Sequence, residues 1–164
     1  MNPSPTTPAP AAHRTDESRP VEPQSGDVAT VLIALQHLQS QIAFANDQLA
    51  KRIGVGSTDF LALVHLSVQG DTPPKKVGEA LGLSSGAMTA LADRLESAGL
   101  VTRLQHPTDR RSFVLALTLD GSAGVNDAGS LYGRAVQEAL PASRRPVAEA
   151  VFRDLGTALG SLVA

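Results

Sequence analysis

The fold is decided by the stretch from Lys75 to Leu119, which reads KKVGEALGLSSGAMTALADRLESAGLVTRLQHPTDRRSFVLALTL. Its local signals predict a short helix, a tight turn, a second helix, a strand, a charged loop and a second strand. Thr72 followed by Pro73 predicts the start of the first helix, because a hydroxyl caps free N–H groups and proline suits the first turn. Gly82 is placed to end this helix, since glycine accepts the left-handed backbone of a helix C-terminus.

The second helix is predicted to begin at Ser84, whose hydroxyl is placed to cap it after a turn of a few residues. Its buried stripe is predicted from positions i, i+3 and i+7, which are Met88, Leu91 and Leu95. The opposite side carries small or hydrogen-bonding residues that leave room for a base edge: Ser85, Gly86, Thr89 and Asp93. An ordinary amphipathic surface helix has the same pattern, so this helix alone does not decide the function.

A β-hairpin is predicted after Gly99, which ends the second helix. Residues 100–104 alternate apolar and polar as a half-buried strand does, and residues 112–117 form a second β-rich run. The loop between them is turn-prone and ends in two guanidinium groups, those of Arg110 and Arg111. Such a hairpin can reach phosphates or the minor groove beside the major groove that the helix occupies. The stretch therefore predicts a winged helix-turn-helix that binds DNA.

The chain resembles the MarR family of bacterial transcription regulators over roughly residues 27 to 164. The family's order and spacing are kept by four elements: LSSGAMT at 83–89, DRLE at 93–96 followed by AGLV at 98–101, PTDRR at 107–111, and Leu117-Thr118 with Gly121. The resemblance implies a mainly α fold, in which a winged helix-turn-helix with a two-stranded wing lies between N- and C-terminal dimerisation helices. It also implies a transcription regulator, a repressor, that binds double-stranded DNA at a pseudo-palindromic operator as a homodimer.

A dimer would place two recognition helices in successive major grooves about 34 Å apart. The residues expected to contact DNA are Ser84, Ser85, Gly86, Thr89, Arg94, Arg110 and Arg111. The hydroxyls would donate to phosphates or base edges, Arg94 would contact the DNA backbone, and one wing arginine would enter the minor groove. The other wing arginine would pair with Asp109 or Asp93, which are the expected wing-stabilising residues. A solvated hairpin tip without a DNA contact is the alternative for the two wing arginines.

The chain is expected to divide into four segments. Residues 1–26 are rich in Pro, Ser, Thr and Ala and are predicted to be disordered, with a DNA- or ligand-contacting arm as the alternative. Residues 27–56 are expected to form an N-terminal dimerisation helix, 57–119 the DNA-binding domain, and 120–164 the C-terminal dimerisation helices. Apolar seams at spacings of three and four mark the first and last helices: Val31, Leu35, Leu38, Ile42, Ala45 and Leu49, and Val147, Val151, Leu155, Leu159 and Leu162. An ordinary core helix is the alternative for the first seam.

Capping residues and glycines mark the remaining helices. Ser57 is expected to cap the helix after the first one, with Asp59 in its first turn, and Thr118 is expected to cap the helix after the wing. That later helix carries an unusual number of glycines, at 121, 124, 129 and 133. Close helix packing and a flexible link both explain these glycines, and the sequence does not choose between them.

Composition limits the other functions. The net charge is −2, but residues 75–111 carry six basic and four acidic side chains, so a local positive surface sits in an acidic chain. Cysteine is absent, which excludes disulfides and thiolate metal sites. His13, His37, His65 and His106 lack metal-ligand spacing, so no metal, cofactor or catalytic centre is expected. No apolar run appears long enough to cross a bilayer and no signal peptide is recognised, so we expect no membrane partner and a cytoplasmic protein.

Effector control is implied only by the resemblance, because family members often bind small phenolic or other aromatic molecules between the dimer helices and the winged domain. The residues expected to line such a pocket are His37, Phe44, Phe60, Leu61 and His65. Core positions are the alternative for most of them. A winged-helix adaptor that binds a protein and never meets DNA is the competing function.

Overall fold

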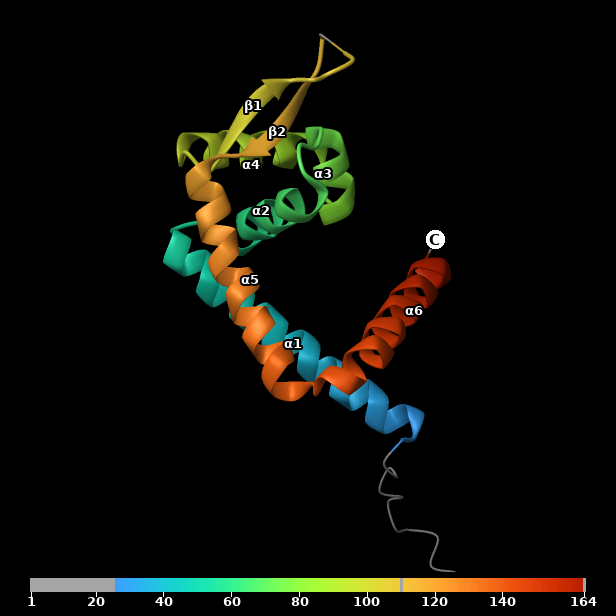
Figure 1. Ribbon diagram of the computed structural model, residues 1–164. Coiled ribbons are helices and arrows are strands. Elements are labelled where there is room, and N and C mark those ends of the chain that lie inside the picture. The colour runs from blue at the N-terminus through green and yellow to red at the C-terminus, as the bar shows by residue number, and fades with distance from the viewer. Residues whose placement is uncertain (1–25, 110, 164) are drawn as a thin grey trace, which may run out of the picture. The chain divides into compact units, whose positions relative to one another are not determined.

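The structure is a computed structural model that describes residues 26–109 and 111–163. It contains two compact units, one ending at Ser40 and the other beginning at Gln41. The predictions for residues 1–25 and for Arg110 lie outside the described residues. The elements follow the order α1 (Val28–Ile53), α2 (Ser57–Gln69), α3 (Pro74–Leu81), α4 (Ser85–Ser97), β1 (Val101–Gln105), β2 (Phe113–Leu117), α5 (Leu119–Ala139), a 3-10 turn (Ala142–Arg144) and α6 (Arg145–Val163) (Figure 1).

Helix α1 begins after Asp27, whose Oδ1 accepts a hydrogen bond from the backbone N–H of Ala29 over 2.6 Å. It ends at Ile53, where Gly54 adopts a left-handed φ of +82°. Part of this helix is long and apolar enough to cross a membrane, with a mean hydropathy of 1.3 over 18 residues. The expectation that no such run exists was therefore wrong, because the polar residues between 28 and 45 are all uncharged. A helix that packs lengthwise on a partner has the same length and composition, so this property does not identify a membrane span.

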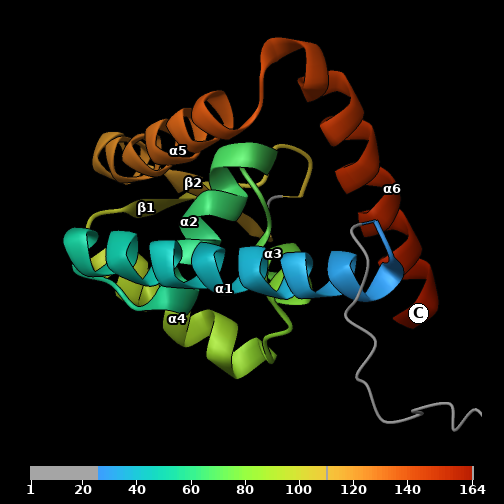
Figure 2. The same cartoon turned by 90° about the horizontal axis from the view of Figure 1, so that it is seen from below.

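The helix-turn-helix forms as the sequence predicts. Gly82 ends α3 in the left-handed conformation, with φ +65° and ψ +31°. The Ser84 hydroxyl caps α4 by accepting from the backbone N–H of Ala87 over 3.3 Å. The predicted stripe of α4 is buried, and it packs with residues of α2, α3 and the wing in one apolar core. Helices α3 and α4 lie next to one another in both ribbon views (Figures 1 and 2).

Two predicted caps are wrong. The Thr72 hydroxyl donates to the Gly70 carbonyl over 2.8 Å, and its extended backbone pairs with Leu115 through N–H···O bonds of 3.1 and 2.9 Å. Thr72 thus makes two backbone hydrogen bonds to β2 of the wing and does not cap α3. Helix α3 has no side-chain cap. Ser57 is the first residue of α2 and not its cap, because its hydroxyl donates to Asp47 over 3.2 Å.

The wing is an antiparallel hairpin in which Val101 pairs with Leu117 and Gln105 pairs with Phe113. Its buried side chains are those of Val101, Val114, Leu115 and Ala116, and of these Val101 and Leu115 join the apolar core that contains α4. Thr118 then caps α5 as predicted, by accepting from the backbone N–H of Gly121 over 3.1 Å. The hairpin is therefore anchored at its base, while its loop extends beyond the helices of its unit (Figure 1).

A second apolar cluster joins the end of α1 to α2 and α5, and it consists of Leu49, Ala50, Phe60 and Ala128. Next to it, the Tyr132 hydroxyl donates to Asn46 Oδ1 over 2.7 Å. Burial raises the pKa of the Tyr132 phenol above its ordinary value of 10.0. These contacts hold α5 to the part of α1 that belongs to the second unit.

The glycines of α5 fall into two groups. A Cβ at Gly121 would lie 2.0 Å from the carbonyl oxygen of Leu100, and a Cβ at Gly124 would lie 2.9 Å from Ile53 Cδ1. At Gly129 and Gly133 a Cβ would meet nothing within 4 Å. Close packing, one of the two explanations that the sequence left open, therefore applies to the first pair.

Candidate nucleic-acid interface

Helix α4 presents a small-residue face to solvent. Gly86, Thr89 and Ala90 are exposed on it, while Met88 and Leu91 face the core. A Cβ added at Gly86 would meet no atom within 4 Å. The space above this part of the helix is open, so a base edge has room to approach.

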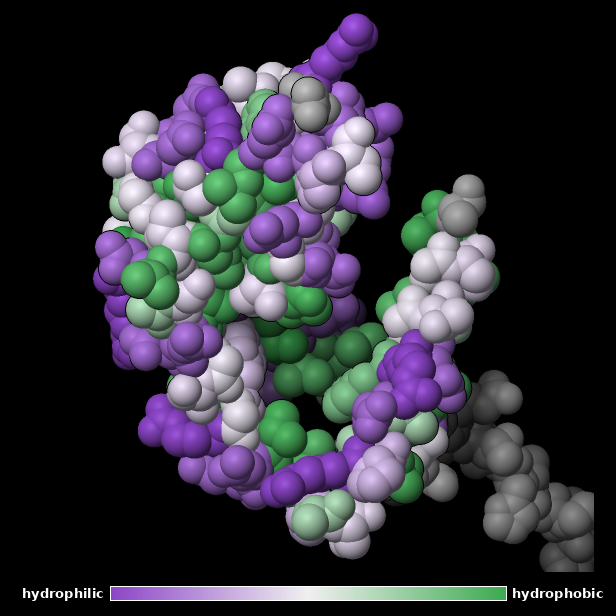
Figure 3. All heavy atoms as spheres, turned by 45° about the horizontal axis from the view of Figure 1, so that its top comes forward, coloured by the Kyte–Doolittle hydropathy of each residue, from purple (hydrophilic) through white to green (hydrophobic). Residues whose placement is uncertain are grey.

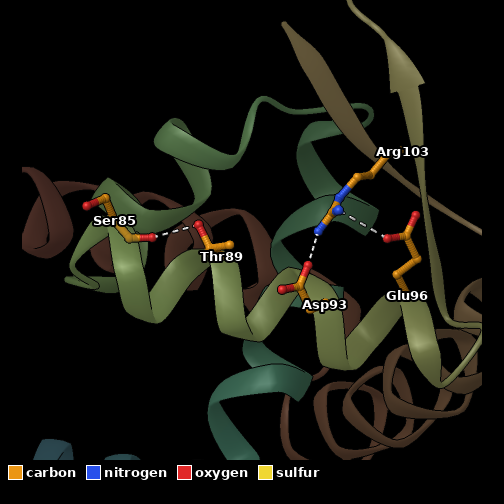
Figure 4. A network of polar contacts seen from close by, with 5 residues as sticks. All are labelled: Ser85, Thr89, Asp93, Glu96 and Arg103. Carbon is orange, nitrogen blue, oxygen red and sulfur yellow. Dashed lines mark hydrogen bonds and ion pairs between the residues drawn. The ribbon is translucent and has the colours of Figure 1, made fainter.

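The hydroxyls of this face are not equivalent. Thr89 Oγ1 donates to the Ser85 carbonyl over 3.0 Å, one turn back in the same helix (Figure 4). Ser84 Oγ accepts from Ala87 as the helix cap, and its own proton remains available for donation. The expected contact of Thr89 with DNA stays a prediction, and in this structure its proton is used within the helix. What Thr89 offers outward is its methyl group and an acceptor lone pair.

An ion-pair cluster ties α4 to the wing. The guanidinium of Arg103 on β1 binds the Asp93 carboxylate through Nη2, and its Nη1 lies 3.3 Å from Glu96 Oε2 (Figure 4). The same guanidinium lies 5.0 Å from the centroid of the Phe113 ring. The expected partner of Asp93 or Asp109 was an arginine of the wing loop, and Arg103 of β1 is a partner that sequence reasoning missed. The available signal was two acids three residues apart on one helix face, followed by an arginine in the next strand.

Arg94 has a partner that sequence reasoning also missed. Its Nε and Nη2 donate to the two carboxylate oxygens of Asp59 over 3.0 and 2.6 Å. Asp59 is 6% exposed, and hydrogen bonding to it raises the pKa of Arg94. The pair lies at the edge of a cavity of about 430 Å³, beside the turn between α1 and α2. The predicted contact of Arg94 with the DNA backbone stays a prediction.

The wing loop is held mainly by its own backbone. Asp109 Oδ1 accepts from the backbone N–H of Arg111 over 3.0 Å, and the Asp109 carbonyl accepts from the N–H of Ser112 over 3.1 Å. His106 Nδ1 lies 3.3 Å from the N–H of Thr108, which is its donor. Asp109 thus contacts the loop through the Arg111 backbone, and its expected pairing with the guanidinium of Arg110 or Arg111 stays a prediction. The Arg111 side chain is exposed, and the wing end of the molecule is hydrophilic (Figure 3).

Positive charge lies beside the recognition helix and not on it. Lys75 and Lys76 are exposed in the first turn of α3, and Lys75 lies 3.8 Å from Glu79. Arg111 lies in the wing loop, whereas Arg94, the one basic residue of α4, is paired with Asp59. The elements next to α4 therefore carry the charges suited to phosphates, and α4 carries an uncharged face.

The residues expected to line an effector pocket lie in different surroundings, and the pocket stays a prediction. Phe60 is fully buried in the apolar core, which is the alternative that the sequence left open. Leu61 is exposed, and His65 lines a separate cavity of about 260 Å³ with Thr72 and Lys76. Successive helical residues turn by about 100°, so positions 61 and 65 share one side of α2 while position 60 faces the core. Phe44 is exposed on α1, and His37 belongs to the first compact unit.

Within residues 26–109 and 111–163, no group of three or more His, Asp or Glu side chains is placed to hold a metal ion.

Comparisons with known proteins agree on one family. Residues 55–113 match the model of the MarR family. The chain is 36% identical over 85 residues to the HTH-type transcriptional regulator MhqR of Bacillus subtilis (strain 168), which covers 50% of this chain and 59% of that protein. It is also 34% identical over 87 residues to the transcriptional repressor MprA of Escherichia coli (strain K12). This match covers 52% of this chain and 49% of that protein. The chain thus spans about half the length of these curated relatives.

Solved structures extend the likeness beyond the winged domain. A crystal structure of RV1404 from Mycobacterium tuberculosis has 28% identity and a TM-score of 0.60, and the match covers 84% of this chain and 97% of that one. The structure of reduced AbfR bound to DNA, where AbfR is a protein of Staphylococcus epidermidis, has 23% identity and a TM-score of 0.53. This match covers 83% of this chain and 94% of that one. At that identity the AbfR match establishes the fold alone.

Proposed function

We propose that this chain, which belongs to the MarR family, is a transcription regulator that binds double-stranded DNA as a homodimer. The observation that carries the proposal is the face of α4, which is open, uncharged and capped at Ser84, between elements that carry exposed basic side chains. A helix of this kind fits the major groove, and lysine or arginine on its neighbours fits the phosphates.

Each part of the winged domain has a role in this proposal. Helix α4 enters the major groove with Ser85, Gly86 and Thr89 facing the bases. Arg111, together with Arg110, contacts phosphates or the minor groove from the wing. Lys75 and Lys76 neutralise phosphates beside the start of α3. The Asp93–Arg103 contact keeps the wing at a fixed angle to α4.

The homodimer is proposed from the unsatisfied apolar surface of the terminal helices. Within α6 as described, no residue is buried. Its large apolar side chains other than the half-buried Leu155 are exposed: Val147, Val151, Phe152, Leu159, Leu162 and Val163. Removing apolar surface from water stabilises by about 25 cal/mol per Å², so a helix of this composition favours a partner. We assign residues 27–56 and 120–164 to the dimer interface and 57–119 to DNA binding.

A dimer of such units binds a pseudo-palindromic operator. We further propose that DNA binding represses transcription, since the relative MprA is named a transcriptional repressor. We also propose that a small aromatic effector releases the protein from the operator. The family's members are transcription regulators, so the chain is proposed not to be an enzyme and to act in the cytoplasm. A membrane-spanning α1 is not part of the proposal, because the dimer uses the same apolar residues.

DNase footprinting on the region upstream of the protein's own coding sequence tests this function. We expect a protected pseudo-palindrome whose half-sites are about 10 base pairs apart, centre to centre. Sedimentation of the complex should give two chains per operator. No protection there, together with no sequence enriched from a randomised duplex library, would overturn the proposal and favour the protein-binding adaptor. A screen of small aromatic molecules by thermal shift, with and without the operator, tests the effector separately.

A further inference from the structure

The exposed face of α4 lacks every side chain that reads a purine by two hydrogen bonds. Arginine and lysine recognise guanine in this way, and asparagine and glutamine recognise adenine. Helix α4 contains no Lys, Asn or Gln, and its one arginine, Arg94, has its Nε and Nη2 on the Asp59 carboxylate.

The two acids on this side of α4 are also occupied. A free carboxylate can accept from the amino group of cytosine. Asp93 and Glu96 instead share the guanidinium of Arg103, which reaches them from β1 (Figure 4). Since this guanidinium also lies over the Phe113 ring, it is held from two sides. The acids therefore remain tied to the wing and are not presented to a base.

Methyl groups are what remain on the outer surface. The Thr89 hydroxyl donates to the Ser85 carbonyl, and because Thr89 is exposed its γ-methyl group can be reached from outside the helix. Ala90 exposes its β-methyl next to it, and Gly86 leaves open space one turn earlier. The hydrogen-bonding pattern thus makes the centre of the face apolar, although Thr89 is a polar residue.

The base edge that complements a methyl surface in the major groove is that of thymine, which carries a 5-methyl group. We propose that α4 reads its half-site chiefly through thymine methyl groups, with Thr89 and Ala90 as the specificity-determining residues and Gly86 giving the access. This inference rests on the proposed DNA binding and adds the class of base that the helix selects. Ser85, in the first turn of α4, can contact a phosphate or a base of an A·T or a G·C pair.

The experiment removes the methyl groups from the DNA. The full chain selects its operator from a randomised duplex library, and affinity is then measured by fluorescence anisotropy at fixed salt. Each thymine of one half-site is replaced in turn by deoxyuridine, which differs by that methyl group. We expect at least one position at which affinity falls about fourfold, the effect of one buried methyl-sized group.

Protein variants identify the reader. Thr89→Ser keeps the hydroxyl bond to Ser85 and removes the methyl, so the deoxyuridine penalty should disappear at one position. Thr89→Val keeps a methyl, so that penalty should persist. The matched control is Thr157→Ser on α6, because Thr157 Oγ1 donates to the Arg153 carbonyl over 3.0 Å with the same geometry. This control should leave the penalty unchanged.

The outcomes separate this inference from the function on which it rests. If no sequence is enriched, the DNA-binding proposal fails and the inference falls with it. If an operator is enriched but deoxyuridine has no effect at any position, the inference alone is overturned. An equal penalty for the unaltered chain and for both Thr89→Ser and Ala90→Gly also overturns it, because the methyl would then be read elsewhere.

Discussion

Arg94 holds Asp59 by a bidentate contact, with Nε on Oδ2 over 3.0 Å and Nη2 on Oδ1 over 2.6 Å. The contact joins α4 to the first turn of α2, two elements that are 35 residues apart in sequence. Because the carboxylate is almost fully buried and the guanidinium reaches it from solvent, the pair fixes the recognition helix on the domain beneath it.

Arg94→Ala is expected to lower the melting temperature by several degrees, because a buried carboxylate then loses the partner that the structure gives it. Arg94→Lys should be intermediate, since an ammonium cannot reproduce the two parallel bonds. The double variant Asp59→Asn with Arg94→Ala should recover part of the loss. Calorimetry on the unaltered chain, Asp59→Asn, Arg94→Ala and the double variant gives the coupling, and a double variant that melts lower than Arg94→Ala would contradict the assigned role.

Arg103→Ala is expected to weaken operator binding without changing its salt dependence. Arg103 neutralises Asp93 and Glu96 and orients the wing, so its loss disturbs geometry but removes no phosphate contact. The folded state should lose under about 1 kcal/mol for each of these partly exposed ion pairs. The control is Arg153→Ala, which breaks an exposed pair with Glu149 on α6. A reduced salt slope for Arg103→Ala would mean that Arg103 itself binds phosphate.

Arg111→Ala should do the opposite and lower both affinity and salt dependence. One lost phosphate contact reduces the slope of log K against log salt by about 0.9. The Arg111 backbone N–H still donates to Asp109 in this variant, so the loop should keep its shape. Arg110→Ala is measured beside it. Unchanged affinity and slope in both variants would remove the wing from the proposed interface.

Local signals predicted the elements of this fold well. Gly82, Ser84 and Thr118 act as the sequence predicts, because a cap or a left-handed glycine depends on its immediate neighbours. The predictions that failed involve distant partners. Thr72 was expected to cap a helix and instead pairs with Leu115. Asp59 lies in the first turn of α2 as expected, but its contact with Arg94 was not predicted.

In the candidate site, too, features set by local sequence were predicted and features set by distant contacts were not. The exposed face of α4 followed from helical spacing, but the state of its hydrogen-bonding groups did not. That Thr89 donates to Ser85 and that Asp93 belongs to Arg103 depends on rotamers and on the approach of β1. For the effector pocket, helical spacing separates the buried Phe60 from Leu61 and His65, and the pocket itself stays a prediction.

The glycines of α5 give a graded prediction for stability. Gly121→Ala should destabilise by about 3 kcal/mol, because its Cβ would overlap the backbone oxygen of Leu100, which cannot move alone. Gly124→Ala should cost less, since the atom in its way is the end of the flexible Ile53 side chain. Gly129→Ala, in open space, should stabilise by up to about 1 kcal/mol. Urea unfolding of the three variants checks the order, and equal effects at 121 and 129 would contradict the close approach.

Tyr132 gives a pH-dependent test of the contact between α5 and α1. It is the sole tyrosine in a chain without tryptophan, so its phenolate absorbance can be followed directly. Burial raises its pKa above 10.0, so the folded protein should ionise at a higher pH than the chain in denaturant. The folded state binds this proton more tightly, so its contribution to stability is complete below about pH 10 and is lost as pH rises through the folded pKa. Tyr132→Phe removes the bond to Asn46 and should cost about 1 kcal/mol, while abolishing the alkaline loss due to this group. Identical titration curves in buffer and in denaturant would show that the phenol is solvated and that this bond does not hold the two helices together.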